Sequence, residues 1–77
     1  MKLKIFLDCD SYECLLKHVP HQAPSRAVIS QAVLLGHTRV VECDELEARE
    51  LLACARSYCS SAIVRIDEAF RVAGLIL

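Results

Sequence analysis

Apolar and polar positions alternate at the start of the chain, with a period of two that is typical of a β-strand. The residues at the even positions of this segment are Lys2, Lys4 and Phe6. We therefore predict a strand over residues 2–8, with leucine and isoleucine on a buried face and these three residues on an outward face. A second strand is predicted over residues 38–43, which follow a glycine and are rich in β-branched side chains.

After each predicted strand the apolar residues recur with the spacing of a helix. The first helix is expected to begin at Asp10 and to end before Pro20, because the residue before a proline avoids helical angles. The second is expected to begin at Asp44. In both, an aspartate precedes a glutamate by three residues, which predicts a capping pair at the helix start. The apolar stripes comprise Tyr12, Leu15, Leu16 and Val19 in the first helix and Ala48, Leu51, Leu52 and Ala55 in the second.

Two further helices are predicted from stripes of the same kind. One begins near Pro24 and runs toward Gly36, and the other begins near Ser60 and runs toward Gly74, since a glycine suits the left-handed turn that closes a helix. Their inner faces comprise Val28, Ile29, Ala32 and Val33 in the former and Ile63, Ile66, Phe70 and Ala73 in the latter. The apolar residues 75–77 are expected to form a short extra strand or to cover a partner.

The order strand, helix, helix thus occurs twice along the chain. We predict a single domain over residues 1–77 of the α+β class, in which a two-stranded ribbon packs with about four helices. Residues 1–36 form the first half and residues 37–77 the second. The halves match only with insertions and share few identical residues, so a chance similarity between two amphipathic stretches is the alternative. The most informative observation is the direction and pairing of residues 2–8 and 38–43.

The composition favours association with another protein or with a second copy of the chain. Of the 77 residues, 55% are hydrophobic, and so short a chain leaves part of its apolar surface exposed. The formal net charge of −1 creates no overall attraction to nucleic acid or to an anionic membrane. No apolar run approaches the about 20 residues that span a bilayer, and the first residues do not form a signal peptide. We therefore expect a cytoplasmic protein without membrane contact, with its five cysteines reduced.

Four residues that could bind a metal lie close together in the sequence, namely Cys9, Cys14, His18 and His21. A cysteine and a histidine four residues apart on a helix could supply half of a zinc site. However, there is no Cys-x-x-Cys pair and a proline separates the histidines, so we interpret the cysteines as small core residues and leave metal binding open. The chain contains no glycine-rich phosphate loop, Gly-x-Ser-x-Gly turn or His-Glu-x-x-His helix. We expect a non-enzymatic protein with no cofactor.

The repeated pattern, with serines at the start of each later helix, resembles the ribbon-helix-helix family. The resemblance implies a single-chain counterpart of that family's dimer, whose outward strand residues enter the major groove while the second helices hold phosphate. It implies groove contacts by Lys2, Lys4, Phe6, Thr38, Val40 and Glu42, and phosphate contacts by Ser25, Arg26, Ser60 and Ser61. The sequence departs from the family at Val40, which offers no hydrogen bond, and at Glu42, which repels phosphate. The family's usual glycine before the second helix is also absent.

Acidic residues gather around the end of each predicted strand, and they are Asp8, Asp10, Glu42, Asp44, Glu45 and Glu47. Helix capping explains most of them, but pairing of the strands is expected to bring the two groups to one edge, where they would either mimic phosphate or meet a basic surface on a partner protein. The favoured hypothesis is a small protein-binding module, an inhibitor or adaptor that acts through this acidic edge or through apolar faces. The alternative is a DNA-binding transcriptional regulator. It gains support if Lys2, Lys4, Arg26 and Arg39 share one surface clear of carboxylates.

Overall fold

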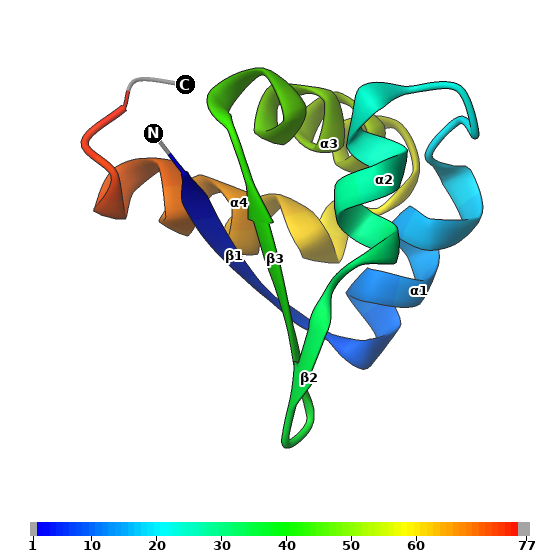
Figure 1. Cartoon of the computed structure of the whole chain (residues 1–77), viewed down its shortest axis with the longest axis horizontal. Coiled ribbons are helices and arrows are strands. Elements are labelled where there is room, and N and C mark those ends of the chain that lie inside the picture. The colour runs from blue at the N-terminus through cyan, green and yellow to red at the C-terminus, as the bar shows by residue number, and fades with distance from the viewer. Residues whose placement is uncertain (1, 76–77) are drawn as a thin grey trace.

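The computed structural model describes residues 2–75, in which four helices pack against one face of a three-stranded antiparallel sheet (Figure 1). Along the chain the elements are β1 (Leu3–Asp8), α1 (Cys9–His18), α2 (Pro24–Ser30), β2 (Val33–Leu35), β3 (Thr38–Cys43), α3 (Glu45–Tyr58) and α4 (Ser60–Val72). The α+β class predicted from the sequence is confirmed. The predicted ribbon corresponds to β1 and β3, and it is extended by the third strand β2.

The sheet has the order β1-β3-β2, so the central strand β3 pairs antiparallel with both neighbours. In the β1–β3 pair, Leu3 lies opposite Cys43 and Asp8 lies opposite Thr38, which confirms that the two predicted strands pair. β2 and β3 form a hairpin whose turn contains Gly36, with a φ of 63°. A glycine accepts this left-handed conformation because it has no Cβ, and it matches the twist of a two-residue hairpin turn.

The prediction of a helix from Pro24 toward Gly36 is wrong for the second half of this segment. α2 ends at Ser30, and the apolar residues that follow form the strand β2. Val33 lies opposite Val40 of β3, so this segment is extended and paired instead of helical, and its side chain is exposed rather than part of the core. Gly36 accordingly turns a hairpin and does not close a helix. A short apolar run does not by itself distinguish a helix from a strand, which is the reason for the error.

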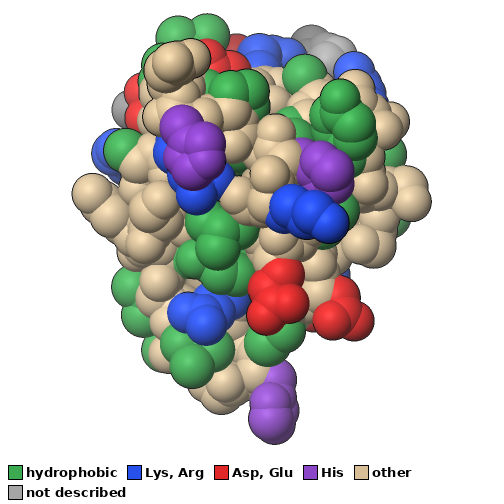
Figure 2. Space-filling model, turned by 90° about the vertical axis from the view of Figure 1, so that its right-hand side faces the viewer, with side chains coloured by type: hydrophobic (Ala, Val, Ile, Leu, Met, Phe, Trp, Pro, Cys, Tyr) green, Lys and Arg blue, Asp and Glu red, His purple; other side chains and the backbone are tan. Residues whose placement is uncertain are grey.

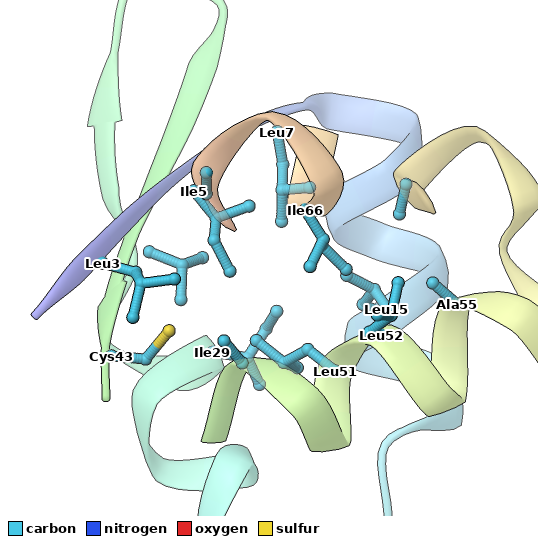
Figure 3. Close-up of a cluster of buried hydrophobic side chains, with 14 of the residues drawn as sticks. Leu3, Ile5, Leu7, Leu15, Ile29, Cys43, Leu51, Leu52, Ala55 and Ile66 are labelled. Carbon is cyan, nitrogen blue, oxygen red and sulfur yellow. The ribbon is translucent and has the colours of Figure 1, made fainter. Parts of the chain in front are cut away.

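The hydrophobic core lies between the inner face of the sheet and the helices. Leu3, Ile5 and Leu7 point from β1 into a cluster that also contains Leu51 of α3 and Ile66 of α4 (Figure 3). The predicted inner face of α3 is confirmed, because all four of its residues are buried: Ala48, Leu51, Leu52 and Ala55. Burial of each large aliphatic side chain contributes about 1.5–3 kcal/mol. The core therefore fixes α4 beside β1.

The helix starts are capped by side chains, as the sequence indicates, but in one case by a different residue. At α3, Oδ1 of Asp44 accepts from the N–H of Glu47 at 2.8 Å, and Oε1 of Glu47 accepts from the N–H of Asp44 at 2.9 Å. This confirms the predicted capping pair. At α1 the cap is Asp8 rather than Asp10, because the helix begins directly after β1 and the N–H of Ser11 donates to Oδ1 of Asp8 at 2.7 Å.

A disulfide joins Cys14 of α1 to Cys59, which lies between α3 and α4, with the two Cα atoms 5.9 Å apart. The expectation that all five cysteines are reduced is therefore wrong for this pair. The spacing of 45 residues gave no signal of it, because only the packing of α1 against the later helices brings the two residues together. Cys9, Cys43 and Cys54 are free thiols.

At the end of the described chain, Gly74 has a φ of 76° and closes α4, as predicted. Leu75 is half-buried, and its N–H donates to the carbonyl oxygen of Phe70 at 2.9 Å. The remainder of the predicted apolar segment, residues 76–77, lies outside the described residues. Within residues 2–75, no helix combines the length and the apolar character that are needed to cross a membrane.

Candidate functional site

The outer face of the sheet is exposed and carries an apolar row. Alternation along β1 turns Lys4 and Phe6 outward, as predicted, while the residues between them enter the core. The strand registers align three apolar residues across the sheet, namely Phe6 of β1, Val40 of β3 and Val33 of β2. Phe6 and Val33 are each about half exposed. This face therefore presents apolar side chains to solvent.

A groove with a volume of about 910 Å³ lies between β1 and α4. We call it the β1–α4 groove. Its lining residues are Lys2, Leu3, Lys4 and Phe6 from β1 and the segment before it, and Val64, Arg65, Glu68, Ala69, Val72 and Ala73 from α4 and its end. Val64 and Val72 are 71% and 79% exposed, so both present apolar surface to solvent beside this groove. The groove thus combines an apolar surface with cationic side chains.

The periodicity of α4 explains how valines reach the surface. Ala62, Ile66 and Ala69 are buried, with Phe70 beside them, and this spacing of three to four residues defines the inner face of the helix. Val64 and Val72 fall on other sides of α4. Because α4 contacts β1 along its length, its outward residues stand next to the outward residues of β1. Two unrelated periodicities, of a strand and of a helix, together build the groove.

The lining of the β1–α4 groove has a net positive charge. Lys2, Lys4 and Arg65 are the cations, and Glu68 is the one acidic lining residue among those described. The carboxylate of Glu68 is paired with Arg71 one turn further along α4. Across the sheet, Lys4 lies opposite Glu42, which partly offsets its charge. The positive field is therefore moderate and local.

The predicted acidic edge does not form. Because β1 and β3 are antiparallel, Asp8 lies opposite Thr38 at one end of the ribbon, whereas Glu42 lies opposite Lys4 near the other end. The six acidic residues are thus divided between the two ends instead of converging. Several of them have local structural roles: Asp8 caps α1, Asp44 and Glu47 cap α3, and Glu45 forms an ion pair with Arg49 at 2.9 Å. The single acidic docking edge is a wrong prediction.

The hydrogen bonds of Asp8 also account for its acidity. The backbone N–H of Ser11, followed by the Ser11 side chain, lowers the pKa of the Asp8 carboxyl below its ordinary value. Partial desolvation opposes this effect, and the positive charge of Arg65 adds a smaller lowering. The carboxylate of Asp8 therefore serves as the cap of α1 and also interacts with the charge of Arg65 in the groove wall.

The residues predicted to contact DNA do not share a surface. Arg26 donates through Nη1 to the carbonyl oxygens of Leu16 and Val19, so its guanidinium caps the carboxyl end of α1. Ser25 is buried, and its N–H donates to Oε1 of Glu50 at 3.1 Å, so a carboxylate of the same chain occupies the place predicted for phosphate. At the second predicted phosphate site, the hydroxyl of Ser61 is hydrogen-bonded to that of Ser11 at 2.8 Å.

Arg39 is likewise engaged within the fold, where it is half-buried. It lies opposite Leu7 on the inner side of the sheet, and its guanidinium carbon is 4.8 Å from the centre of the Tyr12 ring. Thr38 is half-buried at the start of β3, on the outer side. On the side of the molecule that Figure 2 shows, cationic and acidic side chains are interspersed and form no extended field of one sign. Lys2, Lys4, Arg26 and Arg39 therefore do not form the common basic surface that DNA binding requires.

A second, smaller hollow of about 460 Å³ lies among α1, α2 and α3. The rings of His18 and Tyr58 stack beside it with their centres 4.4 Å apart. Glu50, which also lines this hollow, already accepts a hydrogen bond from Ser25. The hollow thus offers fewer free polar groups than the β1–α4 groove, and we regard it as the weaker candidate.

The cysteines do not gather into a metal-binding centre in the described part of the chain. Cys14, one of the four potential metal ligands, is bonded to Cys59, and no three His, Cys, Asp or Glu side chains of residues 2–75 gather as a metal site. Burial, reinforced by the charges of Glu47 and Asp44, raises the pKa of Cys43 to about 12. Burial also raises the pKa of Cys54. Both thiols are poor nucleophiles near neutral pH because they remain protonated.

Sequence reasoning identified Lys2, Lys4 and Phe6 as outward residues but missed the opposite wall of the groove. Val64 and Val72 interrupt the polar side of α4, and this interruption was the available signal. Comparisons of the chain with protein-family models, with curated proteins and with solved structures gave no match. The function is therefore inferred from the β1–α4 groove and the sheet alone.

Proposed function

We propose that this chain is a small, non-enzymatic protein-binding module whose β1–α4 groove takes an apolar segment of a partner protein. The observation that supports this most directly is the exposure of Val64 and Val72 beside Phe6, in a groove large enough for several side chains. Contiguous exposed apolar surface with a polar rim is typical of protein-interaction sites. Of the two surfaces expected from the sequence, the apolar faces are retained and the acidic edge is abandoned.

The charge of the groove defines the kind of partner. Lys2, Lys4 and Arg65 border the apolar surface, and the carboxylate of Glu68 is already paired with Arg71. Complementary charges steer the encounter of two proteins and fix their register, so acidic residues should flank the apolar residues of the bound segment. The partner that fits is a segment with two or three apolar anchors and neighbouring aspartates or glutamates.

The proposal is tested by selecting peptides from a random display library on the immobilised protein. We expect selected sequences to combine apolar anchors with acidic neighbours and to lose binding when Val72→Asp is introduced. Lys4→Glu should weaken binding about tenfold or more, since it places a like charge beside the acidic flank. Lys17→Glu is the matched control, because it makes the same charge change on the exposed side of α1, outside the groove.

Two results would overturn the proposal. One is a set of selected peptides without acidic residues that bind equally well to the protein carrying Lys4→Glu. The other is retardation of duplex DNA at low salt that disappears with Lys4→Ala, which would restore the DNA-binding alternative. We expect no retardation, because Arg26, Arg39 and Ser25 are engaged within the fold.

A further inference from the structure

The strand β2 is an open edge of the sheet. It pairs with β3 on one side, and no described segment pairs with its other side. Its three residues are apolar and exposed, with 57% of Val33, 52% of Leu34 and 60% of Leu35 accessible to solvent. In Figure 1 the turn end of the β2–β3 hairpin projects beyond the helices, and no described strand lies along the outer edge of β2. Proteins ordinarily protect a sheet edge with a very short strand, charges, proline or a covering segment, because an open edge can pair with another strand. β2 is short, with three residues, but it has no charge and no proline, and no described strand covers it.

The sequence of β2 is suited to pairing with itself. If two copies meet antiparallel about a twofold axis at Leu34, the two Leu34 side chains face each other and Val33 of each copy lies opposite Leu35 of the other. Apolar side chains then meet apolar side chains on both faces of the sheet. Aliphatic cross-strand pairs stabilise a sheet, and main-chain hydrogen bonds satisfy the unpaired groups of both edges.

The charges around β2 are compatible with a second copy. β2 itself has no charged residue, and the two Arg39 side chains would be three strand spacings apart, about 14 Å. In the same register, His37 of each copy lies near Gln31 of the other, at the carboxyl end of α2. The last turn of α2 contains no basic residue, and the partial negative charge of a helix carboxyl end favours a donor or cation there.

We propose that two copies of this chain associate through β2 to form a continuous antiparallel sheet of six strands, three from each copy. The apolar row of Phe6, Val40 and Val33 would continue into Leu35 of the second copy. An edge of this length buries less area than the about 1,200–2,000 Å² of a stable interface, so the dimer dissociates at low concentration. This inference does not depend on the proposed occupant of the β1–α4 groove, which lies at the opposite edge of the sheet.

The first test is sedimentation equilibrium of the full chain over a range of concentrations. We expect the average mass to rise from 8.6 kDa toward twice this value in the micromolar to millimolar range. Leu34→Lys should weaken the association at least tenfold, because it brings two like charges together on the axis. Leu46→Lys is the matched control, since Leu46 is an exposed leucine of α3 and should leave the association unchanged. A chain that stays monomeric at about 1 mM, or equal effects of both substitutions, would overturn the proposal.

A second test determines the register. In the antiparallel arrangement, combining Val33→Lys with Leu35→Glu places opposite charges across the interface, whereas combining Val33→Lys with Leu35→Lys places like charges there. We expect the first double variant to dimerise at least tenfold more tightly than the second. Circular dichroism verifies that both variants are folded. Equal association of the two double variants excludes the proposed register.

Discussion

The two edges of the sheet differ in almost every respect that controls strand pairing. β1 has six residues, bears the outward Lys4 and lies beside α4, whereas β2 has three residues, all apolar, and no described strand along its outer edge. An exposed edge invites pairing with other chains unless charge or a covering segment prevents it. The β1 edge is therefore protected both by an outward lysine and by α4, whereas the β2 edge has neither protection. The β1 edge is therefore suited to binding the side chains of a partner segment in the β1–α4 groove, whereas the β2 edge is suited to pairing with an added strand.

This asymmetry originates in the last helix of each half of the chain. α4 has thirteen residues and reaches along β1, while α2 has seven and gives way to the β2–β3 hairpin. The apolar residues that follow α2 are thus used for an exposed strand instead of a longer helix. The two halves share the order strand, helix, helix, but their relationship as a duplication stays a prediction.

Of the substitutions that test this difference between the two edges, removing the core contact of α4 should have the largest effect on stability. Ile66 is fully buried within the cluster that joins α4 to β1. We expect Ile66→Ala to lower the free energy of unfolding by about 2–5 kcal/mol, measured by urea denaturation. If this variant does not fold, Ile66→Val should still cost about 0.5–1.5 kcal/mol. Val64→Ala is the control on the exposed side of α4 and should change stability by less than about 0.5 kcal/mol. Equal costs at both positions would contradict the assigned orientation of the helix.

Removing the disulfide should have the next largest effect, because this bond ties the start of α4 to α1. Cys14 and Cys59 are 45 residues apart. In the chain-entropy account, closing a loop of that size lowers the entropy of the unfolded chain and so stabilises the folded state by about 4 kcal/mol. We expect Cys14→Ser with Cys59→Ser to lower the denaturation midpoint strongly. Cys9→Ser is the control, since that thiol is exposed and free. An unchanged midpoint in the double variant would mean that the crosslink does not constrain the protein in solution.

The cap at the end of β1 should have a smaller effect, and a pH dependence. We expect Asp8→Ala to cost about 1 kcal/mol at neutral pH, because it leaves the N–H of Ser11 without its carboxylate. The folded state lowers the pKa of Asp8 below 3.8, so the carboxylate stabilises the fold above that pH and loses its contribution as the pH falls below it. The difference between the wild type and Asp8→Ala should therefore shrink in acid. Asp10→Ala, which removes no capping hydrogen bond, should cost less, and a larger loss there would favour the cap predicted from sequence.

Much of the fold could be predicted because local signals and long-range packing agree. The alternation in residues 2–8, the apolar stripe of α3 and the Asp44–Glu47 capping pair each specify an element without reference to the rest of the chain. β2 was missed because its apolar run also continues the stripe of α2. Gly36 and His37 between two apolar segments, a two-residue turn with a glycine first, were the stronger signal for a hairpin.

The candidate site was less predictable, because it depends on which elements become neighbours. Outward residues of β1 follow from periodicity, but the meeting of Phe6 with Val72 depends on where α4 packs. The division of the acidic residues follows from an antiparallel register, which composition does not contain. The Cys14–Cys59 bond similarly depends on the packing of α1 against the later helices. Periodicity assigns a residue to a face, and only tertiary contacts assign one face to another.

The smallest expected effect concerns which feature of the β1 edge prevents strand pairing. Lys4→Val removes an outward charge but leaves α4 in place, and a single cross-strand pair with Glu42 contributes at most about 1 kcal/mol. If α4 is the effective cover, the β1 edge stays closed and this variant should change the dimer dissociation constant by less than about twofold, which corresponds to about 0.4 kcal/mol. Lys17→Val is the control for the loss of one positive charge elsewhere. Stronger self-association of Lys4→Val alone, measured by sedimentation, would show that the lysine and not the helix protects this edge.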